Sequence, residues 1–260
     1  MPGDASTGTF LQGLERGLAV IRAFSSETPS LTLSEVARDV SITPATARRI
    51  LLTLEELGYV RSDGRRFSLT PRVLALGWAY LSSLDLGDIA GPFMEELSAK
   101  PRESCSVATL DLPDIVYVAR VPTSRIMTVA LGVGARLPAY ATSMGRVLLA
   151  GLPEDELAAY LGSLDAEPLT QHTVTSIDGL RGVIARAASD GYALVDQELE
   201  LGLRSIAVPI LDARGRPVAA LNVSAHAARS TRASLRSEVL GPLRECADHI
   251  STALRRRGRI

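Results

Sequence analysis

An early stretch of the chain contains two short helical patterns separated by a tight turn. Thr32, with Glu35 three residues later, has the spacing of a capping box, so a helix is expected to begin there. Thr43 followed by Pro44 predicts a second start, because threonine caps a helix and proline lacks the N–H that the first turn leaves unpaired. Gly58 can end this second helix in a left-handed conformation. These signals constrain the fold more than any other part of the chain.

A hairpin pattern follows the second helix. Its residues alternate on both sides of Asp63-Gly64, a dipeptide typical of two-residue turns. Two helices, a tight turn and a hairpin make a winged helix-turn-helix, which places its second helix in the major groove of DNA. The sequence therefore predicts a double-stranded DNA operator as a partner.

The second helix is expected to bury one face and expose another that contacts DNA. Its buried face is predicted to contain Ala47, Ile50, Leu51, Leu54 and Leu57. The exposed face carries small and hydrogen-bonding side chains, as a recognition helix requires. A solvated hairpin tip is the alternative for the wing arginines, but their place after a recognition-type helix favours phosphate contact. The expected DNA-binding residues are Thr43, Ala45, Thr46, Arg48, Arg49, Thr53, Arg65 and Arg66.

Composition limits the class of protein. The net charge of −1 argues against general polyanion binding, although a local positive face is enough for phosphate contact. No run approaches the roughly 18–20 apolar residues of a membrane helix, and the N-terminus lacks a secretory pattern. Cys105 and Cys246 lie far apart in the sequence, so a structural disulfide is not expected. These features predict a cytoplasmic protein with no membrane partner.

The remaining chain divides into a linker and a larger domain. After Thr70-Pro71 a pattern that is apolar on nearly all sides predicts a helix to about residue 83, with Trp78 as either a dimer anchor or a core residue. Antiparallel strands with flanking helices then predict an α+β fold of the GAF or PAS kind. The expected domains are a winged helix-turn-helix at 1–70, a linker helix at 71–86 and an effector-binding domain at 87–260. The expected strands of that domain are 104–110, 114–121, 127–133, 191–199, 204–211 and 217–226.

Four stretches occur in the order found in one family of regulators. They read ERGLAVIRAF, LTLEELGYV, GARLPAYATSMGRVLLA and LELGLRSIAVPILDARGRPVAALNVS. With these stretches the chain resembles the IclR family of bacterial transcriptional regulators over about residues 13–256. The stretches ESCSVATLD, DIVYVARVPT and PAYATSMGRVLLAGL are similar to the subgroup that controls aromatic-acid catabolism through the β-ketoadipate pathway of protocatechuate and 4-hydroxybenzoate.

The resemblance implies a ligand-responsive regulator that binds DNA as a homodimer or as a homotetramer built from two dimers. Its sensor domain would bind a small carboxylic acid and thereby change operator affinity. The expected function is regulation of an aromatic-acid pathway. A regulator of another carbon pathway, with an effector of the glyoxylate or pyruvate type, is the alternative.

The resemblance also implies the place of the effector site, between the sheet and a loop-to-helix turn. Backbone N–H groups at a helix start favour a carboxylate, and Asn222 and Ser224 lie two apart on one strand face. Each position could instead be a plain cap or a surface strand residue. Arg125, Arg136 and Arg204 could balance the ligand's charge, but each alone is more often a surface arginine. The expected effector-binding residues are Thr142, Ser143, Met144, Gly145, Asp196, Ser205, Asn222 and Ser224.

Two of these positions depart from the pattern of the members that sense pyruvate and glyoxylate. Those members often have cysteine where this chain has Ser205, and serine where it has Asn222. The difference is compatible with another acid as the effector.

An enzyme with a vestigial N-terminal domain is the competing class. No histidine pair has metal-binding spacing, and no glycine-rich phosphate loop occurs. Cys105 lies in a strand pattern and is expected to be a core residue. Ser143 lies in Thr-Ser-Met-Gly rather than in a G-x-S-x-G nucleophile motif. We therefore expect no catalytic residues, no metal and no cofactor.

Overall fold

The computed structural model describes residues 10–25, 27–84, 86–99, 103–122 and 132–256. The chain divides into two compact units, Met1–Tyr80 and Leu81–Ile260. Each unit is described by itself below. No helix among the described residues is both long and apolar enough to cross a bilayer.

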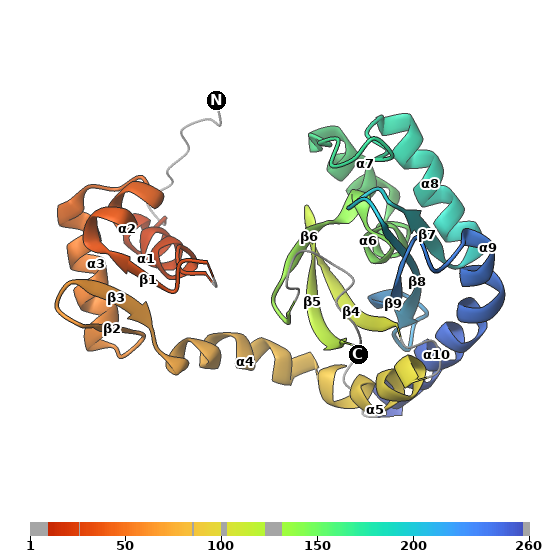
Figure 1. Cartoon of the computed structure of the whole chain (residues 1–260), viewed down its shortest axis with the longest axis horizontal. Helices are drawn as coiled ribbons and strands as arrows, with labels where there is room; N and C mark the ends of the chain where they lie inside the picture. The colour runs from red at the N-terminus through yellow and green to blue at the C-terminus, as the bar shows by residue number, and fades with distance from the viewer. Residues whose placement is uncertain (1–9, 26, 85, 100–102, 123–131, 257–260) are drawn as a thin grey trace. The chain divides into compact units, whose positions relative to one another are not determined.

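The N-terminal unit is a winged helix-turn-helix (Figure 1). Its three-stranded antiparallel sheet has the order β1-β3-β2, and its helices pack around a small apolar core centred on Val36 and Leu51. The wing is the hairpin of β2 and β3. The elements are α1 (Gln12–Arg22), β1 (Ser30–Thr32), α2 (Leu33–Asp39), α3 (Pro44–Glu56), β2 (Val60–Ser62) and β3 (Arg66–Leu69).

The predicted helix boundaries in this unit are confirmed. Thr32 and Glu35 form the reciprocal capping box at the start of α2. The Thr43 hydroxyl accepts a hydrogen bond from the backbone N–H of Thr46 at 3.2 Å, which caps α3. Gly58 follows α3 with φ of 79°, as a left-handed end requires.

Leu57, predicted to be buried, is exposed, and so are two leucines of α1. Leu14, Leu18 and Leu57 have 62%, 46% and 50% of their surface accessible. Val20 of α1 and Phe24, two residues after the helix, lie in the core, and the first turns of α1 lie outside it. Leu57 is the residue after α3, where the chain already turns away.

The linker begins with a 3₁₀ turn, η1 (Pro71–Val73), and continues as α4 (Leu74–Leu84). Several of its large apolar side chains are exposed, whereas Leu81 packs against the core of the C-terminal unit. Leu74, Trp78 and Tyr80 are 74%, 63% and 51% exposed. Trp78 is therefore not a core residue of the N-terminal unit.

The C-terminal unit contains a six-stranded antiparallel sheet of order β6-β5-β4-β9-β8-β7. Helices α5 (Leu86–Ala99) and α10 (Leu240–Arg256) cover one face (Figure 1). Helices α6 (Ser143–Leu149), α7 (Glu154–Ser163) and α8 (Ile177–Asp190) cover the other. The strands are β4 (Ser104–Asp111), β5 (Asp114–Val121), β6 (Arg136–Pro138), β7 (Ala193–Asp196), β8 (Leu203–Leu211) and β9 (Pro217–His226). The predicted α+β fold is confirmed.

Some predicted boundaries in this unit differ. Most of the strand expected at 127–133 lies outside the described residues, and β6 forms the sheet edge instead. The last helix is divided into a short α9 (Arg232–Ser234), a π-helical turn η3 (Leu235–Val239) and α10. The short turn η2 (Ala139–Ala141) precedes α6.

Helix α6 lies unusually close to the backbone of η2. A Cβ atom on Gly145 would stand 2.1 Å from the carbonyl oxygen of Ala139, which is far inside van der Waals contact. Only glycine at this position allows the first turn of α6 to pack there. This contact fixes the height of the α6 N-terminus above the sheet.

We expect Gly145→Ala to destabilise the C-terminal unit by about 2–4 kcal/mol, because the backbone of η2 or α6 must shift. Urea denaturation followed by circular dichroism measures the change. Gly182→Ala in α8 is the matched control, since its added Cβ meets nothing within 4 Å. That control should gain up to about 1 kcal/mol, and equal effects of the two variants would contradict the close-packing argument.

Candidate functional site

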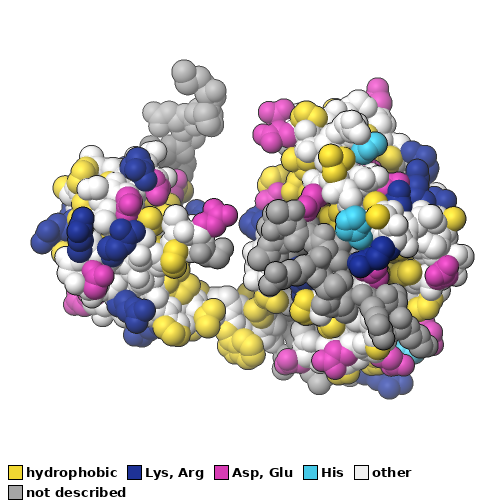
Figure 2. Space-filling view, viewed as in Figure 1, with side chains coloured by type: hydrophobic (Ala, Val, Ile, Leu, Met, Phe, Trp, Pro, Cys, Tyr) yellow, Lys and Arg dark blue, Asp and Glu magenta, His cyan; other side chains and the backbone are white. Residues whose placement is uncertain are grey.

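The first candidate site is the outer face of α3. Ala45, Arg48, Arg49 and Thr53 are exposed, and Thr46 is partly buried. The hydroxyls of Thr43 and Thr46 bond each other at 2.9 Å, and the Thr53 hydroxyl donates to the Arg49 carbonyl at 2.8 Å. The helix thus presents two exposed guanidinium groups beside small side chains. The small side chains allow the helix to approach a DNA groove closely. Figure 2 shows Lys and Arg side chains gathered on this unit.

The wing separates its two predicted arginines. Arg65 is exposed near the tip, whereas Arg66 points back to the body of the unit. The Arg66 side chain donates to the Ser30 hydroxyl at 2.9 Å and to the Ser30 carbonyl at 2.7 Å, and it lies 3.4 Å from a carboxylate oxygen of Glu35. Arg66 therefore joins the wing to β1 and α2, which sequence spacing could not reveal.

The tip of the wing is held by Asp63. Its carboxylate accepts hydrogen bonds from the backbone N–H groups of Arg66 at 2.7 Å and Arg65 at 2.9 Å. These bonds favour the charged carboxylate and lower the pKa of Asp63. The turn therefore keeps its shape at neutral pH.

The second candidate site is a small buried cavity between the sheet and the start of α6. Its polar wall consists of Thr142 and Ser143 at the α6 N-terminus and of strand residues Ser205, Asn222 and Ser224. Its apolar wall consists of Tyr117, Ala141, Val195, Leu199 and Leu203. No charged side chain lines it among the described residues. The centre of a water molecule can occupy only about 10 Å³ of this cavity, which is roughly the room for one water.

Hydrogen bonds connect two elements of the polar wall and cap its helix. The Ser143 hydroxyl donates to the Ser205 hydroxyl at 2.9 Å, which links α6 to β8. The Thr142 hydroxyl accepts from the backbone N–H of Gly145 at 3.0 Å and caps the helix. The helix itself supplies no partner for the N–H groups of Ser143 and Met144, since these are first-turn donors. These N–H groups and the helix dipole can stabilise a bound anion even though no cationic side chain among the described residues lines the cavity.

Tyr117 brings a phenol group to the cavity. Burial raises the pKa of Tyr117 to about 12, because the phenolate would lose its hydration, and the positive charge of Arg120 opposes this rise. The hydroxyl is therefore neutral. Arg120 lies opposite Ser106 in the β4–β5 pairing, so the structure places an arginine near the cavity that the sequence had not marked.

Three predicted effector residues do not line the cavity. Met144 is 1% exposed and packs in the core of the α6 layer, and Gly145 faces η2. Asp196 follows Val195 on β7, and successive strand residues face opposite sides. Its carboxylate instead accepts from the Arg204 side chain at 2.6 Å.

Two of the three candidate arginines, Arg136 and Arg204, do not line the cavity either. Arg204 also donates to the carbonyls of Ala227, at 2.9 Å, and Ser230. Arg136 pairs with Asp111 and Asp114 on the surface. Arg125 lies outside the described residues.

A buried ion pair beside the cavity was not predicted. Arg146 of α6 meets Glu198 through two contacts of 2.7 and 2.5 Å, and its Nε donates to the Tyr140 carbonyl at 2.9 Å. Glu198 also accepts from the backbone N–H of Val174 at 3.1 Å. The pair fixes the loop that carries Leu199 into the cavity. The sequence offers only an arginine in a helix and a glutamate in a loop 52 residues apart.

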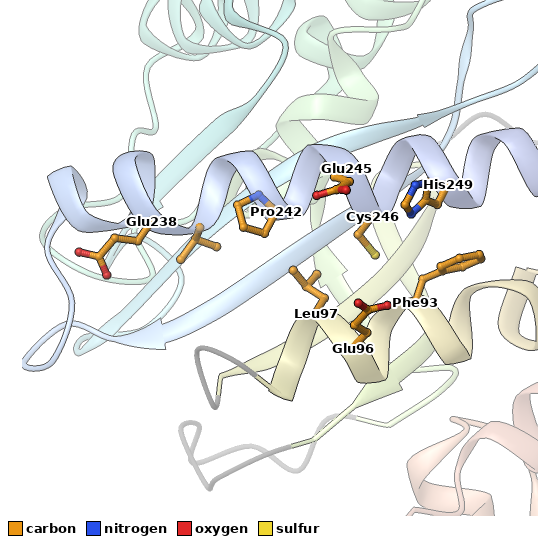
Figure 3. A pocket seen from close by; sticks show the side chains of 9 residues that line it. Phe93, Glu96, Leu97, Glu238, Pro242, Glu245, Cys246 and His249 are labelled. Carbon is orange, nitrogen blue, oxygen red and sulfur yellow. The ribbon is translucent and has the colours of Figure 1, made fainter.

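A larger groove of about 390 Å³ lies between α5 and α10 (Figure 3). Its floor is apolar, with Phe93 and Cys246, but Glu96, Glu238 and Glu245 stand at its sides. Three carboxylates repel an anionic ligand. The groove is therefore the larger hollow but the poorer site for a carboxylic acid.

The described residues contain no metal-binding cluster, and the two cysteines among them are buried. No group of three or more His, Cys, Asp or Glu side chains there could hold a metal ion. Cys105 is buried, and its thiol forms a hydrogen bond of 3.1 Å with the Ser98 hydroxyl. Burial raises the pKa of this thiol, which disfavours the reactive thiolate.

Two family models match the chain. The model "IclR helix-turn-helix domain" matches residues 13–64, and the model "Bacterial transcriptional regulator IclR C-terminal" matches residues 78–252. The second match alone covers more than half of the chain. This protein belongs to the IclR family. The predicted family is confirmed, and the members of this family are transcriptional regulators rather than enzymes.

Relatives of this IclR-family regulator include proteins of aromatic catabolism. It is 47% identical over 232 residues to the Pca regulon regulatory protein of Pseudomonas putida, covering 89% of this chain and 80% of that one. A transcriptional regulator of Rhodococcus sp. RHA1 superposes with a TM-score of 0.83 at 56% identity, over 94% of this chain and 98% of that one. An IclR homologue from Microbacterium hydrocarbonoxydans, in complex with 4-hydroxybenzoate, has a TM-score of 0.82 at 26% identity, over 94% and 99%.

We expect Glu198→Gln to cost about 3–5 kcal/mol of stability, because the Arg146 charge stays buried without its counter-ion. Glu154→Gln is the control. Its partner Arg181 lies 2.8 Å away, but both side chains are exposed, so the loss should stay below about 1 kcal/mol. Thermal and urea denaturation compare the two variants. Equal losses would mean that Glu198 is not a buried partner.

Proposed function

We propose that this IclR-family regulator binds operator DNA through α3 and the wing, and that an aromatic carboxylic acid in the α6 cavity changes its DNA affinity. The observation that carries the effector part is the meeting of neutral hydroxyl and amide groups, first-turn backbone donors and apolar side chains at one buried cavity. The names of the relatives support an aromatic pathway of the protocatechuate and 4-hydroxybenzoate type. A DNA partner supports the proposal that the protein acts in the cytoplasm.

The cavity supports a definite orientation of the ligand. The carboxylate would bind at Thr142, Ser143 and the N-terminus of α6, where partial positive charge from the helix compensates it. The ring would lie against Leu199 and Leu203. The proposed effector residues are therefore Thr142, Ser143, Ser205, Asn222 and Ser224, with Tyr117 added and with Met144, Gly145 and Asp196 acting through packing.

Binding of such an acid requires the cavity to open. Room for about one water cannot hold a benzoate ring, so the lining elements must separate when the ligand enters. A ligand that binds only the open form shifts the population towards it. DNA affinity changes to the extent that operator binding also distinguishes the two forms.

The small size of the cavity favours a second candidate function, in which the effector is as small as glyoxylate or pyruvate. A thermal-shift screen decides between them, because a ligand that binds the folded state raises the melting temperature. We expect 4-hydroxybenzoate and protocatechuate to stabilise the full chain and glyoxylate to have no effect. Stabilisation by glyoxylate or pyruvate alone would favour the second candidate.

We propose that Arg48, Arg49 and Arg65 contact DNA, with Thr43, Ala45, Thr46 and Thr53 shaping the face of α3. Arg49→Ala should weaken binding to a duplex selected by the full chain from random sequence, by about 1–3 kcal/mol. It should also lower the salt slope by about one counterion if the contact is to phosphate. Arg186→Ala, an exposed arginine of the other unit, is the control. Unchanged affinity and salt slope for Arg49→Ala would remove α3 from the interface.

We further propose self-association through the uncovered apolar side chains of α4, with Leu14 and Leu18 of α1 as a second patch. A dimer or dimer of dimers would bury them. Trp78→Asp should lower the sedimentation coefficient in ultracentrifugation to that of a smaller species, because a charge in the interface is costly. Leu201→Asp, at a residue 60% exposed elsewhere, should leave it unchanged. A wild-type monomer would contradict the proposal.

A further inference from the structure

The side chain of Asn222 is in an unusual position. It lies on the central strand β9, is 4% exposed, and lines the α6 cavity. In the sheet it stands opposite Ser106 on β4 and Ala207 on β8. Its Nδ2 donates to the Ser224 hydroxyl at 3.2 Å. Its Oδ1 is buried and has no hydrogen-bond partner within the described part of the chain.

A buried amide oxygen without a donor is costly, because it has lost its water and gained nothing in return. The Ser143 hydroxyl donates to Ser205 and the Asn222 amide nitrogen donates to Ser224, and no donor among the described residues is hydrogen-bonded to Oδ1. The oxygen can therefore be satisfied by a group that enters the cavity. Asn222 thus contributes an unpaired hydrogen-bond acceptor to the lining of the cavity.

We propose that Asn222 recognises a hydroxyl group on the ring of the effector, which donates a hydrogen bond to Oδ1. This inference rests on the proposed function and adds the residue that would distinguish a hydroxylated aromatic acid from one without the hydroxyl group. A carboxylate cannot take this place, because it has no hydrogen to donate and two like dipoles would repel. The carboxylate and the hydroxyl of the ligand thus bind different groups.

The chemistry of the other lining groups makes Asn222 the selective one. Serine and threonine hydroxyls both donate and accept, so they tolerate either kind of ligand group. In Asn222 the amide nitrogen is bonded to Ser224, whereas the unpaired Oδ1 can only accept. A site built to bind a hydroxyl rejects the analogue that lacks it, because a buried polar group is then left unpaired.

Calorimetric titration of the full chain with four acids tests this inference. The probes are 4-hydroxybenzoate, 4-aminobenzoate, benzoate and 4-methoxybenzoate. The first two carry a donor at the ring position, benzoate carries nothing there, and the methoxy compound carries an acceptor. The wild type should bind 4-hydroxybenzoate about 10- to 100-fold more tightly than benzoate. It should also bind 4-aminobenzoate more tightly than 4-methoxybenzoate.

Asn222→Leu removes the acceptor at similar volume, and the ratio between 4-hydroxybenzoate and benzoate should fall to within about threefold. Ser205→Ala is the matched control: it should weaken all four acids alike and keep the ratio. A preference for 4-hydroxybenzoate that survives in Asn222→Leu would overturn the inference. If that variant does not fold, Asn222→Val takes its place. If neither folds, equal wild-type affinities for the donor-bearing and the methoxy acid overturn it, and the expected order supports it.

The titrations also distinguish failure of this inference from failure of the proposed function. If no aromatic acid binds the wild type, the proposed effector class is wrong. If aromatic acids bind with no regard to the ring hydroxyl, the cavity is the effector site and Asn222 does not select for the hydroxyl.

Discussion

The buried pair of Arg146 and Glu198 determines how the two sides of the effector cavity are held together. Arg146 belongs to α6, which forms the polar wall, and Glu198 belongs to the loop that carries Leu199 into the apolar wall. The guanidinium also holds the Tyr140 carbonyl, so the segment before α6 is tied to the same point. Two charges taken out of water need this many partners, because burial otherwise costs more than the attraction returns.

The cavity exists because small residues line the sheet beneath α6. Ala108, Ala207 and Ala220 are fully buried on this face. With Gly145 against η2, they allow the helix to lie low over the strands. Serine and asparagine replace alanine where the floor becomes polar, and a hydroxyl or amide there faces a cavity instead of a methyl group. The floor is thus a continuation of the packing surface with its chemistry changed.

Local signals in the sequence were sufficient for the helix boundaries of the N-terminal unit and for the shared face of Asn222 and Ser224, but not for Asp196. Thr43 and Gly58 act within a few residues of themselves, and the spacing of Asn222 and Ser224 follows from the pleat. The exposed Leu14 and the inward-turned Arg66 depend on neighbours distant in sequence, which periodicity does not contain. The same holds for the pair of Arg146 and Glu198. A resemblance to the family added the place of the cavity, and the structure added which side chains reach it.

The attachment of the wing has a thermodynamic consequence. Arg66 connects β3 to Ser30 and Glu35, so the hairpin and the helices form one rigid body before DNA is met. A DNA-binding unit that is already ordered loses little conformational entropy when it binds DNA. Its heat-capacity change should therefore reflect the area covered alone, without the additional burial that accompanies folding on contact. The protein would then bind the operator without refolding, and the conformational change needed for a good fit would occur in the DNA duplex.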